Sequence, residues 1–545
     1  MNAPFSQLSQ EEVVASRRRM VDDLLVELAS RPEAKDLRLV ETHISWVLLG
    51  SDAFKIKKPV TLPFVDFASF EARESACRAE VRINRRLAPR TYFGVVPIRR
   101  RADGKFTFGA GGAVVDWAVR MTRLDDEGRG DALLARGELR RGHVNALARE
   151  LAKFHERAPV PAALAAELGA PDVVRKNVED NFRALRACPG LDVSPKLLRE
   201  IERWQLAFLR DNEARLAARV AAARIRDGHG DLRLEHVFFR DADDFEIIDG
   251  VEFDERLRIG DACSDVAFLA MDIARLGRVD LAERLLAIYA RAADDFDLYG
   301  LVDFYESYRA CVRAKISALV AKDSAAPRPI RDASRGDARR YLLLAESAQK
   351  DSVLAPVLVA VAGGIASGKS TIAEAVADEL GAPVVDADRT RKAMLGVPPT
   401  AHGRAGAAWA GAYDPSFSEH VYAEVLRRAG VVLASGRPVV IDASFRTARA
   451  RVDAAALARA HGVPFRLIEC VASAQVCKAR LAARDPSTSV SDATPAIYDA
   501  FVSGYEPIVE LTPDVHVRID TGGDATSAMA QLRRTIVTWP RGLVS

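Results

Sequence analysis

The fold of this chain is decided by the stretch Gly363-Gly364-Ile365-Ala366-Ser367-Gly368-Lys369-Ser370. An apolar run, 357–361, precedes it and an amphipathic segment follows it, so a strand, a glycine-rich turn and a helix are predicted. In such a loop backbone N–H groups surround a phosphate, Lys369 reaches the β- and γ-phosphate oxygens, and the Ser370 hydroxyl can bind Mg²⁺. We therefore expect Gly363 to Thr371 to bind a nucleoside triphosphate, ATP, together with Mg²⁺.

Strands and helices alternate through the rest of the carboxy-terminal region. Short segments rich in β-branched residues predict strands, and the segments between them carry apolar residues at three- and four-residue spacing. This alternation predicts an α/β fold with a doubly wound parallel sheet over residues 351–545. The predicted strands span 357–362, 383–386, 438–442, 464–471 and 515–519, and the predicted helices span 419–433, 447–460, 474–483 and 526–537.

Acidic residues follow the second and third of these strands. Asp388 is the candidate general base for a substrate hydroxyl, with Asp386 as a weaker alternative, and Arg391, one helical turn further on, can neutralise an anionic substrate group. Asp442 ends the third strand as the metal-binding carboxylate of a Walker B element does. It is followed by Ala443, and not by the glutamate that polarises water in mechanical ATPases. The pattern favours transfer to a bound hydroxyl over ATP hydrolysis.

Two arginines follow the fourth strand. Arg480 and Arg484 are four residues apart in a predicted helix and share one face, as expected of a lid that closes over the γ-phosphate. A solvent-exposed helix face is the alternative. The spacing of Asp388 and Arg391 resembles that of polynucleotide 5′-hydroxyl kinases and their small-molecule relatives, which implies a P-loop kinase.

The first 320 residues follow a different pattern. Strand-like segments precede an almost wholly helical region, so a small sheet lobe before a larger helical lobe is predicted, an α+β layout typical of protein-kinase-like phosphotransferases. The predicted strands span 37–42, 44–49, 53–57, 92–100 and 114–122, with a helix at 70–87; later helical stretches span 142–156, 195–223 and 263–293, with a strand-like insert at 237–249.

A second phosphate-transfer motif lies in this region, at His229-Gly230-Asp231-Leu232-Arg233-Leu234-Glu235-His236-Val237-Phe238. It resembles the catalytic loop of aminoglycoside phosphotransferases and related small-molecule kinases. The resemblance implies that Asp231 is the base for the substrate hydroxyl. It also implies that Asp249, which follows the next strand, binds Mg²⁺.

Further residues extend this resemblance. Lys55 looks like the ATP-contacting lysine of the third strand, and Glu80 like its partner, although Lys57 points the same way and competes with Lys55. Asp265 matches a residue that supports the catalytic loop. His236 departs from the family pattern, which has Asn there, and imidazole is a poor ligand for Mg²⁺. His236 stands at the second metal position and is the candidate there. Because imidazole suits Mg²⁺ poorly, Glu252 as the ligand or a site with a single metal are the alternatives.

Composition limits the partners. The chain has 545 residues with 78 Lys+Arg and 76 Asp+Glu, a balance that argues against a nucleic-acid surface. The six cysteines are scattered without a C-x-x-C pair, which is typical of a reducing compartment. No apolar run reaches membrane-spanning length and no signal peptide is recognisable. We expect a cytoplasmic protein without a membrane partner.

The chain as a whole resembles a bifunctional fusion family, in which an aminoglycoside phosphotransferase-like domain precedes a P-loop kinase domain of the AAA type. We expect a helical extension at 1–34, the kinase-like domain with a trailing linker and a helix at 338–349 within 35–350, and the P-loop domain at 351–545. The polar, proline-containing segment 322–336 is expected to be a surface loop or linker.

The resemblance implies ATP- and Mg²⁺-dependent phosphorylation of small hydroxylated molecules at two nucleotide sites. One alternative makes the carboxy-terminal domain a polynucleotide 5′-hydroxyl kinase. Another makes the kinase-like domain a non-catalytic, ligand-sensing module that regulates the P-loop domain.

Overall fold

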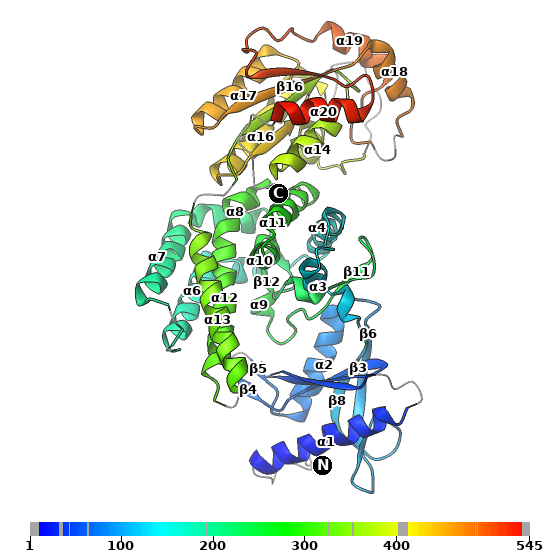
Figure 1. Ribbon diagram of the computed structural model, residues 1–545, viewed down its shortest axis with the longest axis vertical. Coiled ribbons are helices and arrows are strands. Elements are labelled where there is room, and N and C mark those ends of the chain that lie inside the picture. Colours follow the sequence, from blue (N-terminus) through cyan, green and yellow to red (C-terminus); the bar gives the residue numbers. More distant parts are fainter. Residues whose placement is uncertain are drawn as a thin grey trace. The chain divides into compact units, whose positions relative to one another are not determined.

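A computed structural model of the protein is shown in Figure 1. It describes residues 10–31, 36–42, 44–62, 65–188, 190–191, 193–324, 326–350, 354–401, 413–485, 487 and 489–536. The chain forms two compact units, Met1–Ala146 with Phe154–Asn177 and Leu209–Asp272, and Leu147–Lys153 with Val178–Phe208 and Ile273–Ser545. The second unit continues across residue 350, where the sequence led us to expect a domain limit. The domain limits expected from the sequence therefore stay a prediction.

An antiparallel sheet forms the amino-terminal part of the first unit, with strand order β1-β2-β3-β8-β6-β7. Alternate residues of β3 point to opposite faces: Phe54 packs with the helix before the sheet, and Ala53 packs with the helix after it. The elements are α1 (Gln10–Ala29), β1 (Arg38–Glu41), β2 (Ser45–Leu49), β3 (Asp52–Lys57), β4 (Thr61–Leu62), β5 (Val65–Asp66), α2 (Phe70–Asn84), β6 (Tyr92–Arg100), β7 (Phe106–Thr107) and β8 (Ala113–Thr122).

A helical region follows this sheet, with short strand pairs that hold the loops of the candidate site. The predicted α+β layout, with a sheet lobe before a helical lobe, is confirmed. The predicted helix 195–223 is divided at Asn212. The elements are α3 (Gly130–Ala135), α4 (Arg141–Glu156), α5 (Ala162–Leu168), α6 (Pro171–Arg186), α7 (Pro195–Asp211), α8 (Glu213–Ala221), β9 (Ile225–Asp227), β10 (Val237–Phe239), β11 (Phe245–Ile247), α9 (Glu255–Arg258), β12 (Ile259–Asp261) and α10 (Ala262–Arg275).

Three further helices belong to the second unit: α11 (Val279–Ala292), α12 (Val302–Lys322) and α13 (Arg328–Ser347). The stretch predicted as one helix at 263–293 is divided by Gly277, whose φ of 89° ends α10. The loop predicted at 322–336 is wrong from residue 328 onward. Pro329 lies in the first turn of α13, where its missing N–H costs no hydrogen bond, so this proline begins a helix instead of marking a linker.

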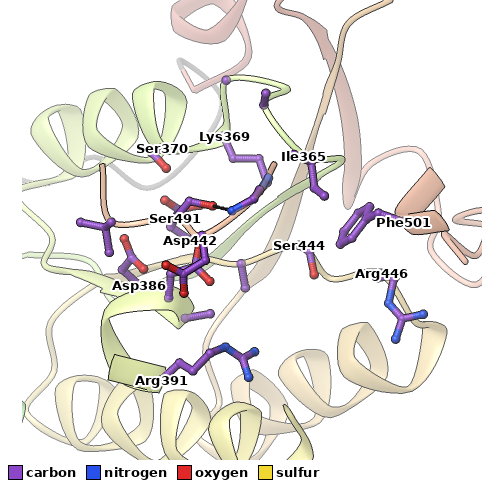
Figure 2. A pocket seen from close by; sticks show the side chains of 18 of the residues that line it. Ile365, Lys369, Ser370, Asp386, Arg391, Asp442, Ser444, Arg446, Ser491 and Phe501 are labelled. Atoms are coloured by element: carbon purple, nitrogen blue, oxygen red, sulfur yellow. Dashed lines mark hydrogen bonds between the residues drawn. The ribbon is translucent and has the colours of Figure 1, made fainter. Parts of the chain in front are cut away.

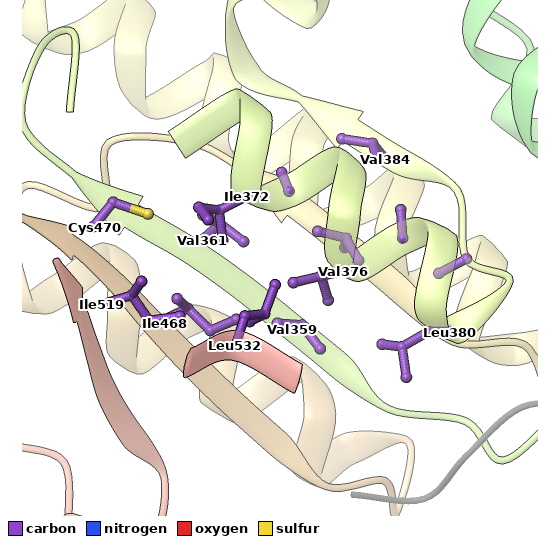
Figure 3. Close-up of a cluster of buried hydrophobic side chains, with 14 of the residues drawn as sticks. Val359, Val361, Ile372, Val376, Leu380, Val384, Ile468, Cys470, Ile519 and Leu532 are labelled. Atoms are coloured by element: carbon purple, nitrogen blue, oxygen red, sulfur yellow. The ribbon is translucent and has the colours of Figure 1, made fainter. Parts of the chain in front are cut away.

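A parallel sheet with strand order β14-β15-β13-β16-β17 forms the core of the second unit, which confirms the predicted α/β fold. Figure 3 shows α14 and α20 packing apolar side chains on one face. The elements are β13 (Leu358–Gly363), α14 (Lys369–Leu380), β14 (Val384–Asp386), α15 (Ala387–Met394), α16 (Pro415–Ala434), β15 (Val439–Asp442), α17 (Ala448–Ala460), β16 (Phe465–Val471), α18 (Ala474–Ala482), α19 (Tyr498–Ser503), β17 (His516–Asp520) and α20 (Ala525–Ile536).

Every residue of β13 is buried, as expected for a central strand of a sheet covered on both faces. Because β13 pairs directly with β15, Val361 lies beside Asp442, and the carboxylate that ends β15 is brought next to the loop that ends β13. In the described part of the chain, no helix combines the length and the apolar character that crossing a membrane requires.

Candidate functional site

The glycine-rich loop joins β13 to α14 through a backbone that non-glycine residues rarely adopt. Gly363 has a φ of 142° and Gly368 a φ of 85°. A Cβ atom at Gly363 would lie 2.5 Å from the carbonyl oxygen of Cys470, so a larger residue cannot be accommodated without moving β16. Lys369 begins α14, and its Nζ donates a hydrogen bond to the Gly364 carbonyl at 2.7 Å. The predicted strand, turn and helix are therefore all present.

Carboxylates from two neighbouring strand ends face this loop. The Ser370 hydroxyl hydrogen-bonds the Asp442 carboxylate. Figure 2 shows Asp386 and Asp442 close together below Lys369. Burial raises the pKa of Asp442, against the effect of Lys369, and burial together with the Asp442 charge raises the pKa of Asp386. A hydroxyl and a carboxylate beside a phosphate loop form an oxygen-rich site of the kind that Mg²⁺ prefers.

Helix α15 places the acceptor-side residues. Asp386 caps its amino terminus by accepting a hydrogen bond from the backbone N–H of Arg389. Asp388 lies in the first turn, and its pKa is raised by burial and by the Asp386 charge, against the effects of Arg391 and Lys369. A buried carboxyl with a raised pKa close to a cation is a suitable proton acceptor for a hydroxyl.

Residues that the sequence analysis missed complete this side. The guanidinium of Arg391 lies 4.5 Å from the ring centroid of Tyr413, whose hydroxyl is 3.5 Å from Oδ1 of Asp388 and 3.2 Å from Oδ2 of Asp492. Lys392 pairs with Asp492 at 2.8 Å. No motif marks Tyr413 or Asp492, because they come from segments far from α15 in the sequence.

The two arginines expected in a lid are placed differently from each other. Arg480, on α18, donates hydrogen bonds to the carbonyls of Ala366 and Thr521 at 3.4 and 2.5 Å, so it contacts the phosphate loop itself. Arg484 lies beyond the end of α18 at Ala482, so the expectation of two arginines on one helix face is wrong. Ala483 caps the helix, and the chain turns before Arg484.

One cavity of about 2030 Å³ is lined by Asp388, Arg391, Tyr413, Arg480 and Asp492. Its volume exceeds the several hundred Å³ usual for a single small ligand, so a nucleotide and an acceptor fit together. The loop residues Lys369 and Ser370 lie on one side of it, and Arg391 lies on the other (Figure 2). Arg484 also lines it.

In the first unit, the predicted lysine and glutamate meet. Nζ of Lys55 lies 2.9 Å from Oε1 of Glu80 and 2.6 Å from Oδ1 of Asp249. Burial acts to lower the pKa of Lys55, but Asp249 and Glu80 outweigh it and hold this pKa well above its usual value. Lys57 competes for the same glutamate at 2.5 Å and also pairs with Glu252. Glu80 thus joins both candidate lysines.

The catalytic-loop candidates are held by ion pairs of their own. Asp231 accepts hydrogen bonds from Arg233 at 3.0 to 3.3 Å. The Nδ1 atom of His236 lies 2.9 Å from the Asp231 carbonyl, and its Nε2 atom lies 3.1 Å from Arg233 and 3.8 Å from Asp249. Lys55 lowers the pKa of Asp249. Each carboxylate of this site therefore already faces a cation of the chain.

Asp265 supports this loop as expected. Its carboxylate accepts hydrogen bonds from the backbone N–H groups of His229 and Gly230 at 2.5 and 3.0 Å. Burial lowers the pKa of His229 to about 4, so the imidazole is neutral at physiological pH. Its Nε2–H can then donate to the Ile248 carbonyl at 2.9 Å while its Nδ1 accepts from the backbone N–H of Asp231 at 3.4 Å.

Among the described residues, no cluster of three or more His, Cys, Asp or Glu side chains is arranged to hold a metal ion. This arrangement is compatible with Mg²⁺, which is usually bound through one or two carboxylates and the phosphates of the substrate. In the P-loop site those ligands would be Ser370 and Asp442. In the kinase-like site they would be Asp249 and His236, the latter a nitrogen ligand that suits Mg²⁺ poorly.

Comparison with known proteins identifies the family. Residues 358–508 match a family model described as an AAA domain, which confirms the P-loop domain. The uncharacterized protein Rv2004c of Mycobacterium tuberculosis is 32% identical over 494 residues, which cover 90% of this chain and 93% of the relative. The chain belongs to the family of this mycobacterial protein. The uncharacterized protein Mb2027c of Mycobacterium bovis matches with the same identity and coverage.

Solved structures resemble separate parts of the chain. A gluconokinase from Sinorhizobium meliloti is 20% identical with a TM-score of 0.24, and covers 33% of this chain and 93% of its own. A choline/ethanolamine kinase family protein from Mesorhizobium loti is 13% identical with a TM-score of 0.34, and covers 60% of this chain and 99% of its own.

Proposed function

We propose that the P-loop domain is an ATP- and Mg²⁺-dependent kinase that phosphorylates a hydroxyl group of a small molecule. One observation carries this proposal: the buried carboxylate of Asp388 shares a cavity with the phosphate loop, so a hydroxyl and a γ-phosphate can be held side by side. In phosphoryl transfer, positioning and charge stabilisation supply most of the rate.

The residues act as follows in this proposal. The acceptor oxygen forms a bond to the γ-phosphorus, the bond between that phosphorus and the β–γ bridging oxygen breaks, and ADP leaves with the electron pair. Asp388 receives the hydroxyl proton. Lys369 and Arg480 stabilise the charge on the phosphate oxygens, and Arg391 holds the acceptor. Bound Mg²⁺ would neutralise phosphate charge, with Ser370 and Asp442 as its protein ligands.

The acceptor class follows from the lining of the cavity. The lining contains acidic residues such as Asp388 and Asp492 as well as arginines such as Arg391 and Arg446. A polynucleotide would need a continuous basic groove to bind its backbone. We therefore propose small hydroxylated molecules as acceptors and a cytoplasmic location, where ATP is available.

We also propose that the kinase-like site binds a second nucleotide, with Lys55 and Glu80 at its phosphates, Asp249 at the metal and Asp231 as base. The ion pair between Asp231 and Arg233 favours a second candidate, in which this site binds nucleotide without transferring phosphate. The base can act only after Arg233 has left it. Replacing Arg233 with Ala distinguishes the two: a gain in transfer favours a latched enzyme, and unchanged nucleotide binding without transfer favours a sensor.

The experiment that tests the main proposal is isotope transfer from [γ-³²P]ATP to a pool of sugars, polyols, sugar acids and amino alcohols. Lys369→Ala should abolish the labelling of at least one acceptor, and Asp231→Asn should leave that acceptor labelled. Labelling that survives Lys369→Ala but not Asp231→Asn would assign the activity to the kinase-like site. Labelling of none by the unmodified chain would contradict the proposal.

A further inference from the structure

An arginine from outside the P-loop fold lies in the cavity of the P-loop site. Arg291 belongs to the last turn of α11, more than 60 residues before the phosphate loop, and it lines the cavity together with Lys369 and Asp386. Its Nη2 atom lies 3.7 Å from Oδ2 of Asp386, and its Nη1 atom pairs with Glu374 of α14. Arg291 thus joins the two helices that carry the loop lysine and the candidate base.

Asp386 transmits the effect of this contact to the acceptor side. One of its oxygens accepts the hydrogen bond that caps α15, and the other faces Arg291. Figure 2 shows Asp386 next to Asp442, so without a cation two carboxylates would repel each other here. The orientation of α15, and with it that of Asp388 and Arg391, depends on where Asp386 is held.

Helix α11 is anchored firmly enough to place an arginine. Arg437, which precedes β15, is buried and pairs with Glu283 of α11 and Asp303 of α12, each at 2.8 Å. Arg428 of α16 pairs with Asp294, two residues after α11, at 2.6 Å. These pairs connect α11 to α16 and to the segment before β15, within one compact unit.

A second ion pair between α11 and α14 offers a comparison within the same contact. Arg284 pairs with Asp378, one turn of α14 beyond Glu374 and further from the phosphate loop. Arg284 does not belong to the described lining of the cavity. Of these two arginines of α11, Arg284 pairs with α14, and Arg291 pairs with α14 and also reaches the site.

We propose that Arg291 is a positioning residue for phosphoryl transfer at the P-loop site, so that this site is complete only with α11 in place. The arginine acts through Asp386 and Glu374, and it keeps the base and the acceptor-binding arginine aligned with the phosphate loop. This inference rests on the proposed kinase function. It adds that a segment outside the matched family domain is part of the catalytic machinery.

The test uses the full chain carrying Asp231→Asn, so that the kinase-like site does not contribute, and the same pool of acceptors. Arg291→Ala should lower kcat about tenfold or more while the KM for ATP changes by less than about threefold, because the nucleotide-binding residues are untouched. Arg291→Lys should restore part of the loss, since an ammonium reaches one carboxylate but not both. Arg284→Ala, the matched control, should keep kcat within about twofold.

Several outcomes would overturn the inference. The first is that Arg291→Ala keeps the kcat of the chain that carries Asp231→Asn alone. The second is that only the KM for ATP changes. The third is that Arg291→Ala, Arg291→Lys and Arg284→Ala lose kcat equally and also unfold at a lower midpoint. Arg291→Gln provides a second measurement if the alanine variant does not fold. If Lys369→Ala leaves transfer intact, the proposed function itself fails. If Lys369→Ala abolishes transfer and Arg291→Ala is fully active, only the inference about Arg291 fails.

Discussion

The two candidate sites differ in how they neutralise their carboxylates. In the kinase-like site Asp249 faces Lys55, and Asp231 faces Arg233. In the P-loop site Asp386, Asp388 and Asp442 lie close enough to raise one another's pKa values, and burial adds to the effect. In the kinase-like site each of these acids has a cation of its own, and in the P-loop site the three acids also repel one another.

The difference teaches what each site needs from its ligands. A cation such as Mg²⁺ relieves repulsion when it enters the P-loop site, so binding is favoured by the resting arrangement. In the kinase-like site a metal must first compete with an internal lysine or arginine. The same residue types, arranged differently, thus predict an open site and a self-compensated one.

The largest expected effect is on catalysis at the open site. Asp388→Asn removes the proton acceptor and should lower kcat for the labelled acceptor about 10²- to 10⁴-fold. The measurement is isotope transfer in the full chain. Asp453→Asn is the matched control, because Asp453 lines the same cavity but pairs with Arg449 on α17. Equal activity of the two variants would rule out Asp388 as the base.

The next effect concerns stability at the compensated site. Lys57→Met leaves Glu252, which is almost fully buried, without its strongest cation, and it should destabilise the first unit by about 3–5 kcal/mol. Arg78→Met removes an exposed pair with Glu74 on α2 and should cost about 1 kcal/mol or less. Urea unfolding followed by hydrogen exchange in each unit measures both. Similar losses in the two variants would mean that buried compensation is unimportant here.

Opposite pH trends should separate the two units. The folded pKa values of Asp386, Asp388 and Asp442 are raised. The stability that these groups allow is therefore fully present below the unfolded pKa of about 4, and it is lost as pH rises through the folded pKa values, because the carboxylates then ionise in a site that disfavours their charge. Asp249 has a lowered folded pKa, so its contribution is present above about pH 4 and is lost as pH falls. Hydrogen exchange in α14 between about pH 4 and pH 8, and in α2 between about pH 2 and pH 5, measures the two trends. Asp442→Asn should flatten the trend in α14, and parallel trends in both helices would contradict the comparison.

The smallest effect should be the same at both sites. Ser69 caps α2, which carries Glu80, and Ser473 caps α18, which carries Arg480. Replacing either serine with Ala should cost about 1 kcal/mol, because each leaves one backbone N–H without its acceptor. Local hydrogen exchange in each helix measures the loss. A much larger loss at one site would show that the sites differ in helix stability as well as in charge.

Local patterns allowed much of the fold to be predicted. The strand, glycine-rich loop and helix around Lys369 were predictable because Gly363 and Gly368 meet backbone requirements that neighbouring residues set. The period of two in β3 places Lys55 and Lys57 on one face, so the competition between them was predictable as well. The first part of α13 was missed, because Pro329 reads as a loop residue unless it falls in the first turn.

The sequence by itself determined the two nucleotide-site motifs, the order of the strands along the chain and the acidic residues at their ends. These depend on the conformational preferences of adjacent residues and on the spacing of apolar side chains. The tertiary structure alone decided that Arg291 reaches Asp386, that Tyr413 joins Asp388 to Asp492, and that Arg233 covers Asp231. The first two of these contacts join segments distant in the sequence, and all three depend on side-chain directions that only the packed chain sets.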